Sequence, residues 1–331
     1  MNNFTYYNPV KIVFGKGAIS ELKNLTPRTG AAMVTYGGGS IKRNGVYAQV
    51  KAALKGIEWI EFGGIEPNPL YETCMKAVKQ AKQKKVRFLL AVGGGSVGDA
   101  TKFIAAAIKF RGGDPWRILS EGAPVTSAVP MGIVLTLPAT GTEMNTNAVI
   151  SRASTQEKLY FSSEHVFPVF SILDPATTCS LPKRQTGNGI IDTFVHVTEQ
   201  YLTYPINAPL QDRQAESILL TLIEEGPKAL KSPRNYDARA NLMWLATQAL
   251  NGLIGLGVPQ DWATHMIGHE LTAFYGLDHA QTLAIVLPGV LTHQFRRKQA
   301  KLAQYGRRVW GLKGTDAAIA KQAIARTEAF F

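Results

Sequence analysis

The sequence is poor in cysteine, with only Cys74 and Cys179 among 331 residues, and no CxxC spacing. A disulfide framework and a thiolate metal site are therefore excluded, and both cysteines are expected to be reduced and structural. Long apolar runs are also missing, because Pro124, Pro130 and Pro138 interrupt the longest uncharged stretch, so no membrane span is expected. The N-terminus has no basic segment followed by an apolar one, so we expect a cytoplasmic protein.

Acidic residues are scarce, since 24 Asp and Glu oppose 36 Lys and Arg, which leaves a net charge of +12. Most of the excess lies in two clusters, Lys76, Lys79, Lys82, Lys84, Lys85 and Arg87, and Arg296, Arg297, Lys298, Lys301, Arg307 and Arg308. In the first, Cys74, Val78 and Ala81 have helical spacing, which puts the lysines on the solvated side of a helix. Non-specific polyanion binding is the alternative. No zinc-finger, RNP or helix-turn-helix signature indicates a specific nucleic-acid partner.

The length corresponds to about two domains. In the N-terminal part, near-continuous apolar runs alternate with helical patterns, which is typical of a parallel sheet covered by helices. The expected strands are residues 31–36, 57–62 and 86–92, and the expected helices are residues 45–54 and 71–84. After Leu173-Asp174-Pro175 only long helical patterns follow, at residues 190–202, 211–230 and 236–252. The prediction is an α/β fold, with a Rossmann-like domain of residues 1–177 and an all-helical domain of residues 178–331.

Glycine is concentrated where phosphates are commonly bound. Residues 93–98 match G-x-G-x-x-G, follow the strand that ends at Val92 and precede a helix expected at residues 99–109, so backbone N–H groups could hold a pyrophosphate. The alternative is a tight turn that uses glycine only for its backbone angles. A second run, Gly37-Gly38-Gly39-Ser40, has basic neighbours and no carboxylate, which leaves room for a 2′-phosphate and favours NADP over NAD.

Histidines and one aspartate form a second pattern. Asp192 and His196 lie one helical turn apart, His265 and His269 do the same, and His279 follows the glycine that ends their helix. Such N and O ligands suit a borderline divalent metal such as Fe²⁺ or Zn²⁺. The alternative for any one histidine is a satisfied core residue.

The residues next to these histidines, and the two remaining histidines, allow three further predictions. The H-E-x-x-H motif is absent because Ala273 occupies its fifth position. Beside the histidines, Ile267, Leu271 and Phe274 are expected to enter the core. His165 and His293 have no partner at ligand spacing and are taken as structural.

At this point the sequence resembles the iron-containing (group III) alcohol dehydrogenase family, and especially its butanol-dehydrogenase-type, NADPH-dependent aldehyde reductases. The resemblance runs along the whole chain. The segments on which the resemblance rests are residues 14–17, 36–40, 62–69, 93–99, 137–145 and 262–281.

The resemblance implies an N-terminal dinucleotide-binding domain, a helical metal-binding domain and an active site in the cleft between them. It implies that Asp192, His196, His265 and His279 are the four metal ligands and that His269 lies nearby in the cleft, where it could relay a proton. The implied cofactor contacts are Gly37, Gly38, Ser40, Gly94, Gly95, Ser96, Asp99, Thr136, Thr140, Asn145 and Lys158. Chains of the family continue with further helices beyond the position of Phe331, so the helical domain is expected to lack its last helices.

The expected activity is the metal- and NADPH-dependent reduction of short-chain aldehydes to primary alcohols, and the reverse oxidation. Hydride passes from the nicotinamide to a metal-polarised carbonyl. A homodimer is expected from the family alone. Two alternatives remain open: an NAD-dependent polyol dehydrogenase of the same superfamily, and a truncated, non-catalytic relative that binds a nucleotide or a polyanion.

Overall fold

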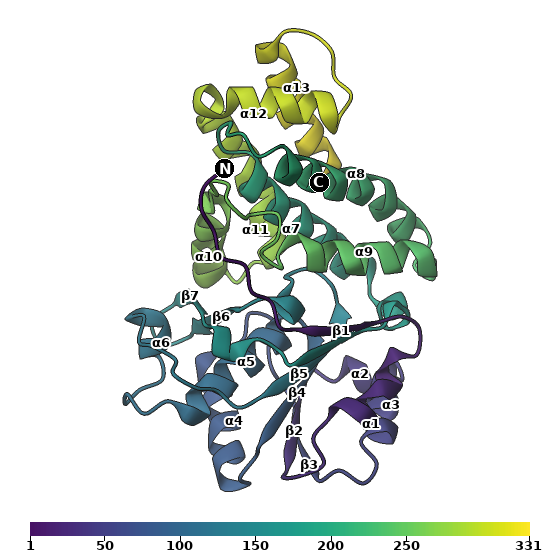
Figure 1. Cartoon of the computed structure of the whole chain (residues 1–331), viewed down its shortest axis with the longest axis vertical. Coiled ribbons are helices and arrows are strands. Elements are labelled where there is room, and N and C mark those ends of the chain that lie inside the picture. Colours follow the sequence, from purple (N-terminus) through teal and green to yellow (C-terminus); the bar gives the residue numbers. More distant parts are fainter. The chain divides into compact units, whose positions relative to one another are not determined.

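The computed structural model describes residues 1–331 and divides into two compact units. One unit is Asn8–Leu181, and the other combines Met1–Tyr7 with Pro182–Phe331. Figure 1 shows a twisted sheet with helices in the first unit and only helices in the second. The predicted fold class, a parallel-sheet domain followed by a helical region, is confirmed.

The first unit is built on one parallel, six-stranded sheet in the order β1-β8-β5-β4-β2-β3. These strands are β1 (Lys11–Phe14), β2 (Ala32–Thr35), β3 (Trp59–Phe62), β4 (Phe88–Gly94), β5 (Met131–Leu137) and β8 (Phe170–Leu173). An antiparallel hairpin of β6 (Asn147–Arg152) and β7 (Glu157–Ser162) stands apart from the sheet. The helices are α1 (Leu22–Leu25), α2 (Ser40–Arg43), α3 (Val46–Ala53), α4 (Tyr71–Gln83), α5 (Gly95–Lys109) and α6 (Arg117–Ser120).

Helices cover both faces of this sheet (Figure 1). Alternate residues of β2 and β4, such as Val34 and Leu90, share one core cluster with Val46 and Val50 of α3. The β4 residues between them, such as Leu89 and Ala91, are also fully buried, which explains why these strands are apolar throughout.

Two helices begin earlier than their patterns predict. Helix α5 begins at Gly95 rather than near residue 99, so most of the glycine motif forms its first turn instead of a loop before it. Helix α7 begins at Lys183 rather than near residue 190. In both helices, glycines interrupt the apolar periodicity of the first turns, so the pattern places the start of the helix too late. These turns have a low intrinsic helix propensity, and packing against the rest of the unit stabilises them.

The second unit is a bundle of helices. Its members are α7 (Lys183–Tyr201), α8 (Pro209–Lys231), α9 (Tyr236–Ala249), α10 (Ala263–Tyr275), α11 (His279–His293), α12 (Phe295–Arg308) and α13 (Asp316–Phe330). Helix α7 is the most enclosed, because every residue from Thr193 to Tyr201 is buried. Its apolar side chains share one core with α8, α9, α11, α12 and α13.

One prediction for α10 is wrong. Ile267 and Phe274 are 45% and 59% exposed, whereas Thr264, His265, Gly268, His269 and Thr272 form the buried face. The buried face carries the histidines, because Nδ1 of His265 contacts Glu199 of α7 and the His269 ring lies beside that of His279 of α11. The helix ends as predicted at Gly276, which has a left-handed backbone (φ 66°).

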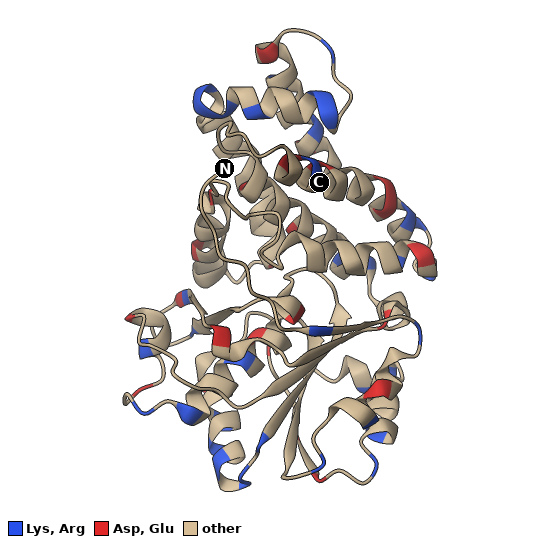
Figure 2. Ribbon diagram, in the orientation of Figure 1, with Lys and Arg blue, Asp and Glu red and all other residues tan.

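The two basic clusters differ in their surroundings. The basic residues around α4 are all exposed, which is a solvated helix face (Figure 2). In α12, Lys298 and Lys301 are buried instead and pair with Asp261 (2.7 Å) and Asp212 (2.6 Å). Both lysines of this cluster thus serve internal ion pairs. No helix in the chain is long and apolar enough to cross a bilayer.

The ion pair of Asp261 and Lys298 predicts a specific acid dependence. Burial raises the pKa of the Asp261 carboxyl, but Lys298 and the Ala263 N–H outweigh burial and lower it. The contribution of the pair is therefore complete above the ordinary carboxyl pKa of about 3.9 and is lost as the pH falls through the lower folded-state value. Lys298→Met should reduce the free energy of unfolding at pH 7 more than at acid pH, measured by denaturant titration.

The matched control is Arg297→Met, which removes the same charge from an exposed neighbour. Equal effects of Lys298→Met at neutral and acid pH would contradict the role of the pair.

Candidate metal centre and cofactor site

Helix α7 presents three chemically active side chains on one face. Asp192, His196 and Glu199 follow one another at i, i+4 and i+7, and are 3%, 4% and 4% exposed. A carboxylate this deep in a helical core is costly unless it is paired. The groups around Asp192 must therefore compensate its negative charge.

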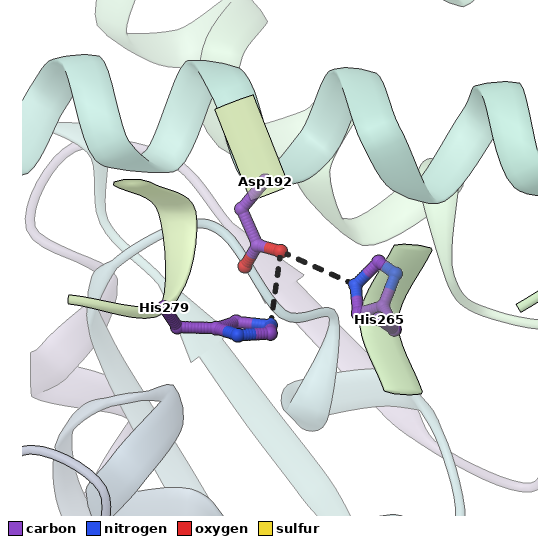
Figure 3. Close-up of side chains that lie close together, drawn as sticks. All are labelled: Asp192, His265 and His279. Carbon is purple, nitrogen blue, oxygen red and sulfur yellow. Dashed lines mark ion pairs between the residues drawn. The ribbon is translucent and has the colours of Figure 1, made fainter. Parts of the chain in front are cut away.

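The compensation comes from α7 itself and from α10 and α11, whose His265 and His279 are drawn with Asp192 in Figure 3. Oδ1 of Asp192 lies 3.5 Å from Nε2 of His196, 3.7 Å from Nε2 of His265 and 3.8 Å from Nε2 of His279. The structure thus brings together all four residues that the resemblance implies as ligands. His265 also stacks on His196, with ring centroids 4.7 Å apart.

These distances fit a shared cation better than direct hydrogen bonds. Each exceeds the hydrogen-bond limit of about 3.2 Å, whereas ligands about 2.1 Å from a tetrahedral ion lie about 3.4 Å apart. Oδ1 of Asp192 and Nε2 of His265 are buried and have no hydrogen-bond partner. Ligand atoms of Asp192, His265 and His279 lie within 4.8 Å of one another, so this donor set fits a divalent metal.

The electrostatics of the cluster agree with its geometry. Burial raises the pKa of the Asp192 carboxyl, but His196, His265 and His279 outweigh burial and hold it well below its usual range. Burial lowers the pKa of His265, yet its contacts with Asp192 and Glu199 raise it to about 9. Asp192 is therefore negative at neutral pH and suited to a cation.

Residues outside the ligand set hold α10 and α11 against α7. Glu199 contacts Nδ1 of His265 and also accepts the Thr264 N–H at 2.6 Å. Asp278, the residue before His279, accepts from Asn188 (3.0 Å) and pairs with Arg184 (2.7 Å). Glu199 is not among the residues predicted from the sequence, although its place seven residues after Asp192 puts it on the same helix face.

His269 lies one turn after His265 on the buried face of α10 and is 5% exposed. Its ring centroid is 5.4 Å from that of His279 and 6.5 Å from that of His265. It is thus a neighbour of the cluster and not part of the group around Asp192.

The predicted cofactor residues belong to the other unit, where many of them lie at the carboxyl ends of strands. β2 and β4 are neighbours, and their chain continuations, α2–α3 and α5, lie on opposite faces of the sheet (Figure 1). Such a switch point is where ligands bind in open α/β sheets. Gly37, Gly38 and Ser40 follow β2, and Thr136 is the second-last residue of β5.

The first turn of α5 needs glycine for close packing. A Cβ on Gly95 would lie 2.5 Å from Thr140, and one on Gly98 would lie 2.5 Å from Thr142. The bare turn therefore lets the 140–142 segment approach the N-terminal N–H groups of α5, which favour an anion.

Hydrogen bonds join the remaining predicted residues. Asp99 accepts from Thr142 Oγ1 (2.7 Å) and from the Val149 N–H (3.0 Å), so both of its oxygens are used within the protein. Asn68 accepts from Lys158 Nζ at 2.9 Å and donates its N–H to Ser96 Oγ at 3.3 Å. Asn68 thus connects two predicted cofactor residues.

The fully buried Lys102 of α5 holds the loop that contains Asn145. Its Nζ donates to the Asn145 carbonyl and Oδ1, both at 2.8 Å, and to the Asn147 carbonyl at 2.9 Å. Asn145 in turn donates to the Thr140 carbonyl. Lys102 was also missed, although a lysine on an apolar helix face was visible in the sequence.

A carboxylate does reach the region after β2, but from β3. Glu61 accepts from Lys42 Nζ at 3.0 Å and from Tyr36 OH at 2.8 Å. It therefore holds Lys42 beside the glycine run and is not at the tip of β2. Gly38 itself has no heavy atom within 4 Å of where its Cβ would be.

Comparison with known proteins gives one consistent family. The family model for iron-containing alcohol dehydrogenases matches residues 9–175, and that for the C-terminal part of the same family matches residues 186–331. The chain is 61% identical over 334 residues to the NADPH-dependent aldehyde reductase YqhD of Escherichia coli, covering all of this chain and 86% of that one.

Two further similar proteins are named for different cofactors. The NADP-dependent alcohol dehydrogenase 3 of Entamoeba histolytica is 45% identical, over all of this chain and 86% of its own length. The solved structure of NADH-dependent butanol dehydrogenase A from Thermotoga maritima has a TM-score of 0.96 at 39% identity, covering 100% of this chain and 84% of that one.

The cluster predicts that His265→Ala binds Zn²⁺ at least about 100-fold more weakly, because loss of a ligand costs more than loss of an outer-shell partner. Competition with a chromophoric chelator measures the affinity. His293→Ala is the control, since it removes an exposed histidine at the end of α11. Unchanged Zn²⁺ affinity in His265→Ala would remove this histidine from the centre.

Proposed function

Because the chain belongs to the family of iron-containing alcohol dehydrogenases, we propose that it is a metal-dependent NADPH:aldehyde reductase. It reduces short-chain aldehydes to primary alcohols and catalyses the reverse oxidation. The observation that carries the proposal is the buried Asp192 carboxylate with three imidazole nitrogens within 3.8 Å of its Oδ1. The activity printed for the 61% identical Escherichia coli relative supports it.

The proposed ligands of one Fe²⁺ or Zn²⁺ ion are Asp192, His196, His265 and His279. Such an ion, when bound, would supply Lewis-acid polarisation of the aldehyde oxygen. Asp192 would provide negative charge to the bound ion, and the imidazoles would provide neutral nitrogen donors. Asp192, His196 and His265 are buried, which weakens screening by water and strengthens their electrostatic contacts, whereas the His279 side chain is 22% exposed.

The proposed NADPH site uses the strand ends and the first turn of α5. Its residues are Gly37, Gly38, Ser40, Gly94, Gly95, Ser96, Asp99, Thr136, Thr140, Asn145 and Lys158. NADPH would supply the hydride that reduces the carbonyl carbon. Glycines let the dinucleotide approach the backbone, and Lys102 and Asn68 hold Asn145 and Lys158 in place.

The product alcohol also needs a proton, and we assign its delivery to His269. This histidine is buried beside the ligand cluster, and histidine exchanges protons near neutral pH. No side-chain nucleophile is required. From the family resemblance we further propose a cytoplasmic homodimer without a nucleic-acid partner.

The reductase proposal predicts that NADPH oxidation by butanal depends on metal. After chelation the rate should fall by a factor on the order of a thousand or more, because Lewis-acid polarisation contributes several kcal/mol. Added Fe²⁺ or Zn²⁺ should restore it, as measured by nicotinamide absorbance. NADPH fluorescence on the chelated protein controls for cofactor binding. Full activity in demonstrably metal-free protein would contradict the proposal.

A substitution at Gly38 tests the preference for NADPH over NADH, because a side chain added at this position would extend into open space. Gly38→Asp places a carboxylate that binds a ribose 2′-hydroxyl and repels a 2′-phosphate. The ratio of kcat/KM for NADPH to that for NADH should fall at least about tenfold, which is about 1.4 kcal/mol. The KM for aldehyde serves as the internal control. A preference for NADH in the unaltered protein would favour the NAD-dependent alternative.

A further inference from the structure

Glu199 is a buried carboxylate that the proposed reaction does not use. It is 4% exposed and sits in the last turns of α7, two turns from Asp192. A buried carboxylate without a function would be costly, so its two oxygens require an explanation.

One oxygen serves the start of α10. Trp262, the residue before this helix, offers no side-chain cap, and Asp261 accepts only the Ala263 N–H, so the Thr264 N–H needs another acceptor. Oε1 of Glu199 accepts the Thr264 N–H at 2.6 Å. The Glu199 backbone carbonyl also accepts the Asp261 N–H at 2.9 Å, just before the helix. A negative charge at this helix end is electrostatically favourable.

The other oxygen, Oε2, contacts Nδ1 of His265. An ionised carboxylate can only accept, so Nδ1 must carry a proton. When His265 binds a cation as a neutral imidazole, its lone pair is therefore on Nε2. Nε2 is the buried atom that has no hydrogen-bond partner and lies 3.7 Å from Oδ1 of Asp192. The same carboxylate therefore fixes the tautomer of His265 and the position of the helix that carries it.

We propose that Glu199 is a positioning residue for the metal centre, which selects the Nδ1–H tautomer of His265 and thereby directs Nε2 at the cation. The inference rests on the proposed function, because it concerns the same metal site. Asp192 and Glu199 together carry two negative charges, which balance a divalent ion in a buried environment. Outer-shell carboxylates of this kind orient metal-binding histidines in other proteins.

Glu199→Gln tests this with an isosteric side chain. If the amide oxygen accepts from Thr264, the amide NH₂ faces Nδ1 and forces the proton onto Nε2. If the oxygen faces Nδ1–H instead, the NH₂ meets the Thr264 N–H, and two donors are in contact. Either arrangement disturbs His265, so we expect Zn²⁺ to bind about 10- to 100-fold more weakly.

The matched control is Glu216→Gln. Glu216 is also buried in the helical unit, at 6% exposure, but accepts from Tyr201, Gln304 and Arg308 instead of a proposed ligand. It should lose thermal stability without loss of Zn²⁺ affinity. Zn²⁺ titration of both variants against a competing chelator, with thermal melts of the metal-free proteins, separates positioning from stability.

A second measurement does not depend on a variant that folds. In the Zn²⁺-loaded, ¹⁵N-labelled protein, side-chain nitrogen spectra should show a protonated Nδ1 for His265. A protonated Nε2, or wild-type Zn²⁺ affinity in Glu199→Gln, would overturn the role of Glu199 while metal-dependent activity stands. Failure of the unaltered protein to bind Zn²⁺ would instead overturn the metal centre and, with it, both proposals.

Discussion

The helical unit depends on one electrostatic constraint: the carboxylate of Asp192 is almost completely buried and must be compensated. Three imidazole nitrogens surround its Oδ1 at 3.5 to 3.8 Å, and they come from α7, α10 and α11. Because α7 is far from α10 and α11 along the chain, the cluster couples metal chemistry to the packing of the bundle. The same charge that would destabilise an apolar core gives this core a preference for a cation.

Residues of α7 hold both of the helices that carry the other proposed ligands, α10 and α11. Glu199, near its end, holds the start of α10 and the ring of His265, while Arg184 and Asn188, near its beginning, hold Asp278 at the start of α11. In the α/β unit, the buried Lys102 has a similar role toward the Asn145 loop. In both units a buried charged side chain fixes the segment that carries the proposed contacts.

Local patterns were sufficient to predict the parallel sheet, because strands buried on both faces are apolar throughout. They also indicated the pairs Asp192–His196 and His265–His269, because helical spacing is local. The buried face of α10 was not predictable in this way, since Ile267 and Phe274 are exposed while histidines and threonines are buried. Glu199 and Lys102 were missed because their partners lie 65 and 43 residues away.

The central claim is that one divalent ion sits among Asp192, His196, His265 and His279. Anomalous scattering from Zn²⁺-soaked crystals, recorded on both sides of the zinc absorption edge, tests it most directly. The account predicts one strong peak, about 2.0–2.2 Å from a carboxylate oxygen of Asp192 and from a ring nitrogen of each of the three histidines. A peak elsewhere, or none at this cluster in protein shown to be folded, would contradict it.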